Sequence, residues 1–227
     1  MDSQLQSAIS LSHLRELPAN VLKDLLTGAR RATVPASSVF HREGEGAPHL
    51  DLVVSGLVRV YVAAPDGRTM TVRYCRPGAL LGMMSLFTPG FTMPATVQAL
   101  VDAELLGLSP AVVRRAATTD VRVARVFLRE QSERAISFLY EVPGSAFASV
   151  RQRVARHLLD LALTGGPELI VPVTQQQLAD AVGTVREVVV RVLHDLRAAG
   201  VVRTERDRII IIDPGRLITE QGWNSSS

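Results

Sequence analysis

Two arginines and a glutamate at the start of a predicted helix have the chemistry needed to read the edges of base pairs. Arg186, Glu187 and Arg191 are spaced by one and then four residues, which places them on one side of a helix. Arginine can donate to both acceptors of guanine in the major groove, and glutamate can accept from the amino group of cytosine. The same residues would also suit a solvated surface with an ion pair between Glu187 and Arg191. Taken alone, they leave DNA reading and a plain charged surface open.

A helix-turn-helix predicted over residues 174–199 would present these side chains outward. Thr174 and Gln177 have the spacing of a capping box at the start of the first helix. Gly183 then suits a tight turn that needs a positive φ. Each helix carries an apolar face at helical spacing, formed by Leu178, Ala179 and Val182 in the first and by Val189, Val192, Leu193 and Leu196 in the second. The cap, the glycine and the two faces together favour DNA reading.

The segments around this motif predict a winged helix. An amphipathic helix over 147–163 and a short strand over 169–173 precede it, and two apolar runs at 201–204 and 208–212 follow it as a hairpin. Arg206 and Arg208 at the tip of that hairpin are candidates for contacts with phosphates. A merely solvated turn is the alternative for both.

The first half of the chain changes from helical to alternating spacing. Residues 9–29 predict short helices, and residues 30–108 predict many short strands with glycines between them. Ser55-Gly56 and Pro65-Asp66-Gly67 have the chemistry of hairpin turns. This pattern is typical of a jelly roll. We therefore expect an α+β protein with an N-terminal β-roll (double-stranded β-helix or jelly-roll) sensor domain, a long dimerisation helix and a C-terminal winged helix-turn-helix.

A long helix predicted from about Asp120 carries a seam at alternating spacings of four and three residues. This seam consists of Ala124, Leu128, Gln131, Ala135, Phe138 and Val142. Such spacing favours packing along a partner helix in a homodimer, and a helix lying on the barrel of its own chain is the alternative. Gln131 and Arg134 weaken the seam midway, and Pro143-Gly144 is expected to end the helix as a hinge. The expected domains are residues 1–109, 110–143 and 144–227.

Composition excludes several classes of protein. The net charge of +3 over 227 residues gives no general attraction to polyanions, so DNA affinity must come from local placement of charge. The single cysteine excludes an internal disulfide and an iron–sulfur cluster with several cysteine ligands. No charged and apolar leader begins the chain, and no apolar run approaches the ~20 residues of a membrane span. We expect a cytoplasmic protein with no membrane association.

Enzymatic interpretations find little support in the sequence. A metal-dependent β-barrel enzyme would need closely spaced histidines with a carboxylate, and the five histidines have no such spacing. Neither a P-loop nor a G-x-S-x-G elbow occurs. We therefore expect no catalytic activity and no metal site.

The order of these parts resembles the CRP/FNR family of bacterial transcription regulators. In the barrel the resemblance rests on RPGALLG at 76–82 and on the spacing of GMMSLFTPGFTMPATVQA at 82–99. In the last part it rests on VRQRVARHLLDLA at 150–162 and TQQQLADAVGTVREVVVRVLHDL at 174–196. It covers roughly residues 11–213, and the last of these stretches is the most specific.

The resemblance implies a homodimer that reads a two-fold symmetric DNA site, with one recognition helix in each of two successive major grooves. Arg186, Glu187 and Arg191 match the base-contacting residues of cyclic-AMP-binding members, which implies a TGTGA-like half-site. Contacts with the DNA backbone are implied for Thr174, Gln176, Val188 and Arg206. Val185 and Val188 replace hydroxyl residues, so hydrogen bonds to the backbone should be lost there, although a valine methyl can touch a thymine methyl. RNA polymerase is a further partner that the resemblance leaves open.

The resemblance also locates an effector pocket, but this sequence departs from it. Met83, Met93 and Pro94 replace the glutamate, arginine and serine that hold a cyclic nucleotide, and Phe138-Leu139 replaces the pair that meets adenine. A buried phosphate would lack a cation there, at a cost of about several kcal/mol. We therefore expect an effector other than cyclic AMP, if any. The expected pocket is apolar and consists of Leu81, Gly82, Met83, Met84, Met93, Pro94 and Phe138.

Four alternatives remain for this pocket. It takes a hydrophobic molecule, it takes haem, it is a filled core in a protein that binds DNA constitutively, or it is an altered cyclic-nucleotide site that still gates the protein. No cofactor is predicted. Haem is disfavoured because no histidine stands out as an axial ligand, and His41 and His49 are expected at the surface.

Overall fold

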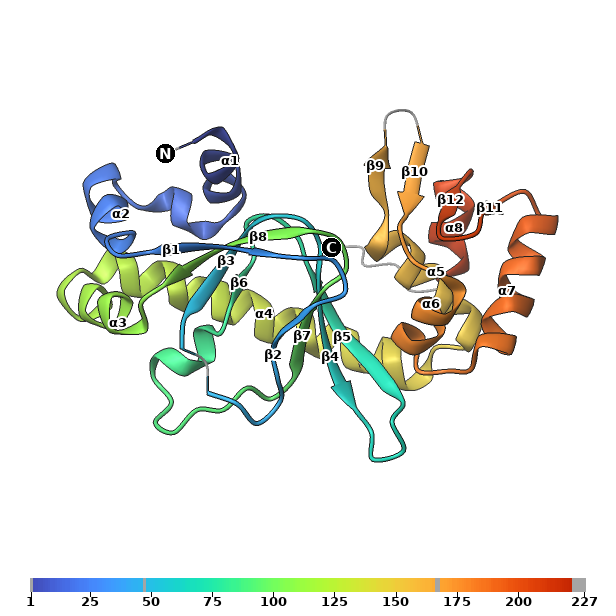
Figure 1. The fold of residues 1–227 in the computed structure, drawn as a ribbon, viewed down its shortest axis with the longest axis horizontal. Coiled ribbons are helices and arrows are strands. Elements are labelled where there is room, and N and C mark those ends of the chain that lie inside the picture. The colour runs from blue at the N-terminus through green and yellow to red at the C-terminus, as the bar shows by residue number, and fades with distance from the viewer. Residues whose placement is uncertain (1, 47, 166–167, 222–227) are drawn as a thin grey trace. The chain divides into compact units, whose positions relative to one another are not determined.

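The chain forms two compact units. The structure is a computed structural model (Figure 1) that describes residues 2–46, 48–165 and 168–221, with the backbone alone at 140–146. The first unit comprises Met1–Val60 with Arg73–Ser137, and the second comprises Tyr61–Val72 with Phe138–Ser227.

Two four-stranded sheets build the predicted roll. One has the order β1 (Arg30–Val34), β8 (Ala103–Leu108), β3 (Leu50–Ser55) and β6 (Leu80–Leu81). The other has the order β2 (Val39–His41), β7 (Thr96–Ala99), β4 (Val58–Ala63) and β5 (Thr69–Cys75). The pairs β1–β8, β3–β8, β3–β6 and β2–β7 are antiparallel. The prediction of a jelly-roll-like sensor domain is confirmed.

The turn between β3 and β4 depends on Gly56. Its φ is +92°, and an added Cβ would lie 2.6 Å from the carbonyl oxygen of Asp102 and 2.7 Å from the Cα of Ala103. Both the left-handed conformation and the close backbone approach require glycine. A turn therefore forms at Ser55-Gly56, but the prediction of a hairpin there is wrong, because β3 and β4 belong to different sheets.

Strands β3 and β8 are buried on both faces. Alternate side chains enter two separate clusters, since successive residues of a strand point to opposite sides of its sheet. Leu52 and Leu106 belong to the helix-side core, whereas Val53 and Leu105 belong to the roll core. The helix-side core consists of Leu5, Ala8, Ile9, Leu14, Leu17, Leu25, Leu50, Leu52, Val54, Leu80, Met83, Leu86, Leu106, Leu108, Val113, Val123, Val126 and Phe127. The roll core consists of Val34, Val53, Val58, Cys75, Leu81, Met93, Val97, Ala99, Ala103 and Leu105.

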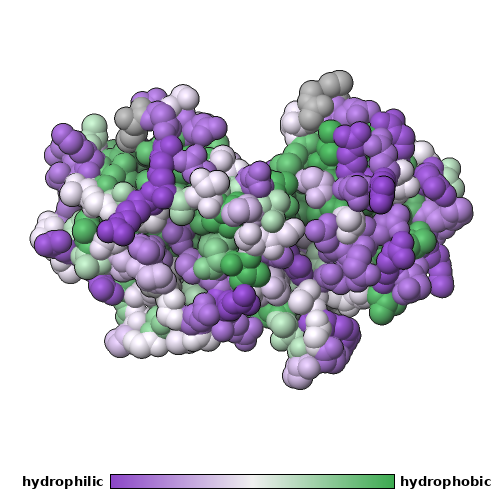
Figure 2. Space-filling view, in the orientation of Figure 1, coloured by the Kyte–Doolittle hydropathy of each residue, from purple (hydrophilic) through white to green (hydrophobic). Residues whose placement is uncertain are grey.

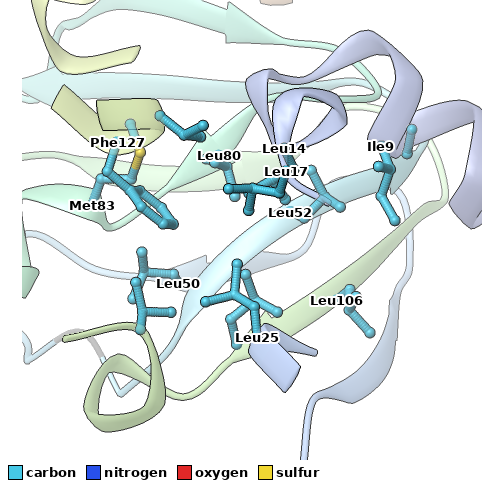
Figure 3. Packing of buried hydrophobic residues seen from close by; sticks show 14 of the residues in the cluster. Ile9, Leu14, Leu17, Leu25, Leu50, Leu52, Leu80, Met83, Leu106 and Phe127 are labelled. Carbon is cyan, nitrogen blue, oxygen red and sulfur yellow. The ribbon is translucent and has the colours of Figure 1, made fainter. Parts of the chain in front are cut away.

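The N-terminal helices cover the sheet that contains β3. These are α1 (Ser3–Leu11), the 3-10 helix η1 (His13–Glu16) and α2 (Ala19–Leu25). Figure 3 shows Leu14 and Leu17 beside Leu52 and Leu80, with Leu25 below them near Leu50. Short helices form as predicted, although α1 begins at Ser3 and so lies mostly before the predicted segment, and their leucines supply much of the helix-side core. A further 3-10 helix, η2 (Met83–Leu86), adds Met83 to the same core.

Helix α3 (Pro110–Thr119) leads into the long helix α4 (Val121–Phe147). Asp120 accepts a hydrogen bond from the backbone N–H of Arg122 at 2.9 Å, as expected for a residue that begins the helix. The prediction that Pro143-Gly144 ends this helix is wrong, because α4 runs on to Phe147. An interior proline removes one backbone hydrogen bond and its ring crowds the carbonyl of the residue four positions earlier, at a cost of about 3 kcal/mol, so the rest of this long helix must offset that cost.

Arg134 lies on the side of α4 that faces the roll. Its guanidinium donates to the carbonyl oxygen of Leu80 and to Glu130, the latter at 3.1 Å. Burial, with the charge of Arg73 nearby, lowers the pKa of Arg134 below its usual value. Arg134 thus makes its contacts within its own chain, and its effect on the seam stays a prediction. The spacing of residues along a helix does not predict this contact, because it does not show which backbone carbonyl of another element lies beside Arg134.

The second unit contains the predicted winged helix-turn-helix. Its helices are α5 (Val150–Leu161), α6 (Gln175–Val182), α7 (Arg186–Ala198) and α8 (Pro214–Glu220). Its sheet has the order β11 (Val202–Thr204), β12 (Ile209–Ile211), β10 (Glu168–Val171) and β9 (Leu163–Gly165). The helix predicted to reach residue 163 ends at Leu161, and β9 follows it. Neither β9 nor α8 was predicted from the sequence.

His41 is buried, contrary to its expected place at the surface. It is 9% exposed, and its Nε2 lies 2.6 Å from Oδ2 of Asp51, which is 7% exposed. Because His41 is on β2 and Asp51 is on β3, the hydrogen bond joins the two sheets of the roll. A buried imidazole is accommodated where a carboxylate satisfies it. His49 is exposed, as expected.

We expect Asp51→Ala to destabilise the protein by about 1–3 kcal/mol, because the buried imidazole of His41 would lose its partner. Differential scanning calorimetry of the full chain measures the change. Glu43→Ala is the matched control, since it removes an exposed carboxylate two residues from His41 and should change stability little. Equal effects of the two substitutions would show that the hydrogen bond between the sheets contributes nothing.

Candidate nucleic-acid interface

The first helix of the motif begins with the predicted capping box. The hydroxyl oxygen of Thr174 accepts from the backbone N–H of Gln177 at 3.2 Å, and Oε1 of Gln177 accepts from the backbone N–H of Thr174 at 2.8 Å. Helix α6 ends at Gly183, whose φ is 75°. The backbone N–H of Thr184 donates to the carbonyl oxygen of Ala179 at 3.0 Å. These bonds fix the direction in which the chain leaves α6 and enters α7.

Helix α7 is held by a single buried stripe. Val189, Val192, Leu193 and Leu196 are all 8% exposed or less, and they form the apolar face that the sequence predicted. Leu178 and Ala179 of α6 are completely buried. Because α6 and α7 pack together through these side chains, α7 cannot turn about its own axis without exposing apolar surface.

The opposite face of α7 carries the proposed base readers. Arg186, Glu187 and Arg191 are exposed. Within the described residues, none of the three forms an ion pair or a side-chain hydrogen bond, so the alternative pairing of Glu187 with Arg191 is not observed. Figure 2 shows a mostly hydrophilic surface over α7, with isolated apolar residues. Three polar groups able to pair with base edges are thus exposed together on one helix.

The start of α7 differs from the other helix starts in this unit. Val185 is the N-cap residue and provides no side-chain hydrogen bond. In contrast, Ser149 and Thr174 begin α5 and α6 with capping boxes, and Asp213 caps α8. Helix α7 therefore depends on its buried stripe rather than on its cap.

The four residues predicted to contact the DNA backbone lie in different settings. Thr174 is half-buried and acts as a helix cap, and Val188 is half-buried on α7. Gln176 is exposed and donates to Oδ1 of Asp180 at 2.8 Å. Arg206 is exposed between the two strands of the wing.

Arg208 of the wing is already paired. Its Nε donates to Glu205 at 2.5 Å, and this hydrogen bond lowers the pKa of the Glu205 carboxyl. Among the described residues Arg206 forms no ion pair, so it is better suited than Arg208 to meet a phosphate. The sequence alone does not distinguish the two arginines, because it does not show which of them Glu205 binds.

Arg151 and Arg153 of α5 fix the frame around the motif, and sequence reasoning missed both. Arg151 donates to both carboxylate oxygens of Glu220 on α8, at 2.7 and 2.8 Å, and lies 3.8 Å from Asp195 of α7. The hydrogen bond from Arg151 lowers the pKa of Glu220. Arg153 donates to the carbonyl oxygen of Val182 at 3.3 Å, at the end of α6. These contacts tie α5 to the motif and to α8.

The seven residues of the predicted effector pocket lie in several environments. Leu81 and Met93 belong to the roll core, whereas Met83 belongs to the helix-side core. Met84 is 52% exposed, and Pro94 is also exposed. Gly82 has a φ of 74° and begins η2, and Phe138 is exposed and belongs to the second unit. The six residues of the first unit are thus divided between two cores and the surface, and the shared pocket stays a prediction.

The predicted seam lies along an exposed side of α4. Leu128 is 69% exposed, Ala124 and Gln131 are half-buried, and Ala135 and Phe138 are exposed. Val142 lies outside the described side chains. Beside the seam is an apolar groove of about 450 Å³, lined by Met83, Leu86, Phe87, Val121, Ala124, Arg125, Phe127, Leu128 and Gln131. Val123, Val126 and Phe127 on the other side of the helix are buried in the helix-side core.

Two expected absences concern only the residues that the structure describes. No cluster of three or more histidine, cysteine or acidic side chains within them has the arrangement of a metal site. None of the helices described has the length and apolar character needed to cross a bilayer.

Comparison with known proteins assigns both parts of the chain. Residues 31–120 match the cyclic nucleotide-binding domain, and residues 152–219 match the Crp-like helix-turn-helix domain. The transcriptional regulator LdrP of Thermus thermophilus is 33% identical over 199 residues, which cover 86% of this chain and 95% of that protein. The cAMP-activated global transcriptional regulator Vfr of Pseudomonas aeruginosa is 28% identical over 211 residues, covering 89% of this chain and 98% of that protein.

Solved structures give the same assignment. TTHB099, a CRP-family transcriptional regulator that is also from Thermus thermophilus, is 30% identical with a TM-score of 0.69, covering 85% of this chain and 97% of that chain. CLP of Xanthomonas campestris, described as a c-di-GMP responsive global regulator, is 25% identical with a TM-score of 0.72, covering 86% and 99%. With its roll, its long helix and its winged helix-turn-helix, this chain belongs to the CRP/FNR family of transcriptional regulators.

Proposed function

We propose that the protein is a homodimeric regulator that reads a palindromic, TGTGA-like site through Arg186, Glu187 and Arg191. The observation that carries this proposal is that these three side chains are exposed on the face of α7 opposite its buried stripe and have no ion-pair partner among the residues that the structure describes. Arginines suit the guanines of such a half-site, and the glutamate suits a cytosine of the complementary strand. Transcription regulation requires no catalysis, so we propose no enzymatic activity.

Phosphate contacts in this proposal come from the wing and from the start of α6. Arg206 supplies a positive charge, Gln176 and Thr174 supply polar groups, and Val188 supplies only van der Waals contact. Because the net charge of the chain is only +3, these local contacts fix the position of α7 on the duplex. We place the protein in the cytoplasm, where RNA polymerase is the partner that a regulator bound beside a promoter would meet.

Arg186→Ala tests base reading directly. We expect it to cost about 1–3 kcal/mol on the specific site and much less on random DNA, because the lost contact is with a base edge. Fluorescence anisotropy at one fixed salt concentration measures both affinities. Arg115→Ala is the control, since it removes the same charge from an exposed position on α3. Equal losses on specific and random DNA would refute base reading by Arg186.

The homodimer in this proposal uses the exposed seam of α4. Leu128 and Phe138 are large apolar side chains left in water, and the seam continues into the apolar groove beside Ala124 and Leu128. Their spacing is that of helices packed along one another. A second copy of α4 would cover these side chains, and its seam would be identical, as a two-fold interface requires.

Leu128→Glu should separate the subunits, because two carboxylates would meet near the two-fold axis and apolar burial would be lost. We expect the dimer dissociation constant to rise by at least about tenfold, which corresponds to 1.4 kcal/mol. Sedimentation velocity over a range of concentrations measures it. Ser137→Glu adds the same charge at an exposed position on α4 outside the seam and should leave the dimer intact. A Leu128→Glu protein that remains dimeric would exclude this seam.

The effector is proposed to be something other than cyclic AMP. The match to the cyclic nucleotide-binding domain keeps an altered nucleotide site as the second candidate. Met83 and Met93 are buried and uncharged, however, and Pro94 offers no side-chain donor, so these positions cannot pair with a cyclic phosphate. The other candidates for the sensor domain are that it binds a hydrophobic ligand, that it binds haem, or that it has no effector.

Isothermal titration calorimetry with cyclic AMP and with cyclic GMP tests this part. We expect no binding at micromolar nucleotide, because no residue replaces the missing glutamate, arginine and serine. A cyclic-AMP-binding relative titrated under the same conditions serves as the positive control. Micromolar binding of either nucleotide would overturn the interpretation of Met83, Met93 and Pro94.

A further inference from the structure

We infer that Val190 is a fourth base reader, and that its side chain contacts the 5-methyl group of a thymine in each half-site. This inference rests on the proposed function, because it requires α7 to enter the major groove. It adds a sequence preference that neither the arginines nor the glutamate supply.

Val190 lies in the middle of the reading face. It follows Arg186 by four residues and Glu187 by three, and it directly precedes Arg191. Residues three and four apart are neighbours on a helix surface, so Val190 adjoins Arg186 and Glu187, and Arg191 follows it about 100° further around the helix. A duplex close enough to meet Arg186 and Arg191 therefore also meets the side chain between them.

The fold does not account for a valine at this position. Val190 is 40% exposed, whereas Val189, Val192 and Leu193 of the same helix are buried in the apolar stripe. A β-branched side chain also lowers helix propensity slightly, so an exposed position gains nothing from it. Its exposed methyl groups gain free energy only when another surface covers them.

The chemistry of the major groove specifies which group Val190 meets. Valine has no donor or acceptor, so it cannot pair with the polar atoms of a base edge. The methyl group of thymine is the apolar group that base pairs present in that groove. Val190 therefore discriminates thymine from cytosine by contact with this methyl group.

Helix geometry limits where the thymine lies. Four residues of helix span about 6 Å along the axis. This is less than two steps of the duplex at about 3.4 Å each. The thymine is thus within two base pairs of the guanine that Arg186 reads.

Replacing thymine by deoxyuridine tests this contact, because it removes the methyl group and leaves base pairing unchanged. The full-length protein first selects its site from random DNA. Each thymine of that site is then replaced in turn, symmetrically in both half-sites, and dissociation constants are measured by anisotropy. At one thymine within two base pairs of that guanine, we expect the native protein to bind about three- to fivefold more weakly per half-site.

Val190→Ala should remove this uracil penalty while the protein still binds its site specifically. Alanine favours helix, so α7 should fold in this variant. Val185→Ala is the matched control, since Val185 is 54% exposed at the start of the same helix. This variant should keep the penalty at the same thymine.

Three results would overturn the inference. Uracil penalties that are equal in the native protein and in Val190→Ala would exclude the contact while leaving the proposed function standing. A penalty removed by Val185→Ala instead would assign the methyl contact to Val185. Failure to select any specific site would overturn the proposed function, and the inference with it.

Discussion

The packing of α7 on α6 is the constraint on which the proposed reading face depends. Four apolar side chains, Val189, Val192, Leu193 and Leu196, are buried on one side of α7 and so set its rotation about its own axis. Successive residues of a helix point about 100° apart, so a rotation by one position would bring Arg191 and Asp195 into the buried stripe in one direction and Arg197 in the other. The identity of the exposed face is therefore fixed by residues that never meet the ligand. Gly183 and the contacts of Arg151 and Arg153 then hold this pair of helices in its frame.

In the roll, too, the spacing of apolar residues determines which side chains are buried together. Strands β3 and β8 have no face left for water, so their alternation divides side chains between two apolar clusters rather than between core and solvent. Leu52 and Val53 are neighbours in the chain and belong to different clusters. The N-terminal helices complete the cluster that the sheet alone would leave open. The sensor domain thus needs its first thirty or so residues for a closed core.

The features that depend on residues close together in the sequence were predicted correctly. The capping box of Thr174, the positive φ of Gly183 and the alternation of apolar residues all follow from short stretches of chain, and all were found. Two features that the sequence missed depend on partners from distant elements. His41 is buried because Asp51 lies on a strand of the other sheet, and Arg134 turns to the roll because the carbonyl of Leu80 is there. The exposure of the reading face was predictable for the same local reason, whereas the pairing of Arg208 and the role of Arg151 depend on tertiary contacts.

Met83 and Phe127 share the helix-side core and also line the groove beside the seam. Since interiors are packed without slack, a displacement of η2 would press directly on α4 through these two side chains. These two side chains therefore belong both to the lining of the groove and to the helix-side core. A change in the packing of that core would therefore also change the shape of the groove, because the same two side chains belong to both.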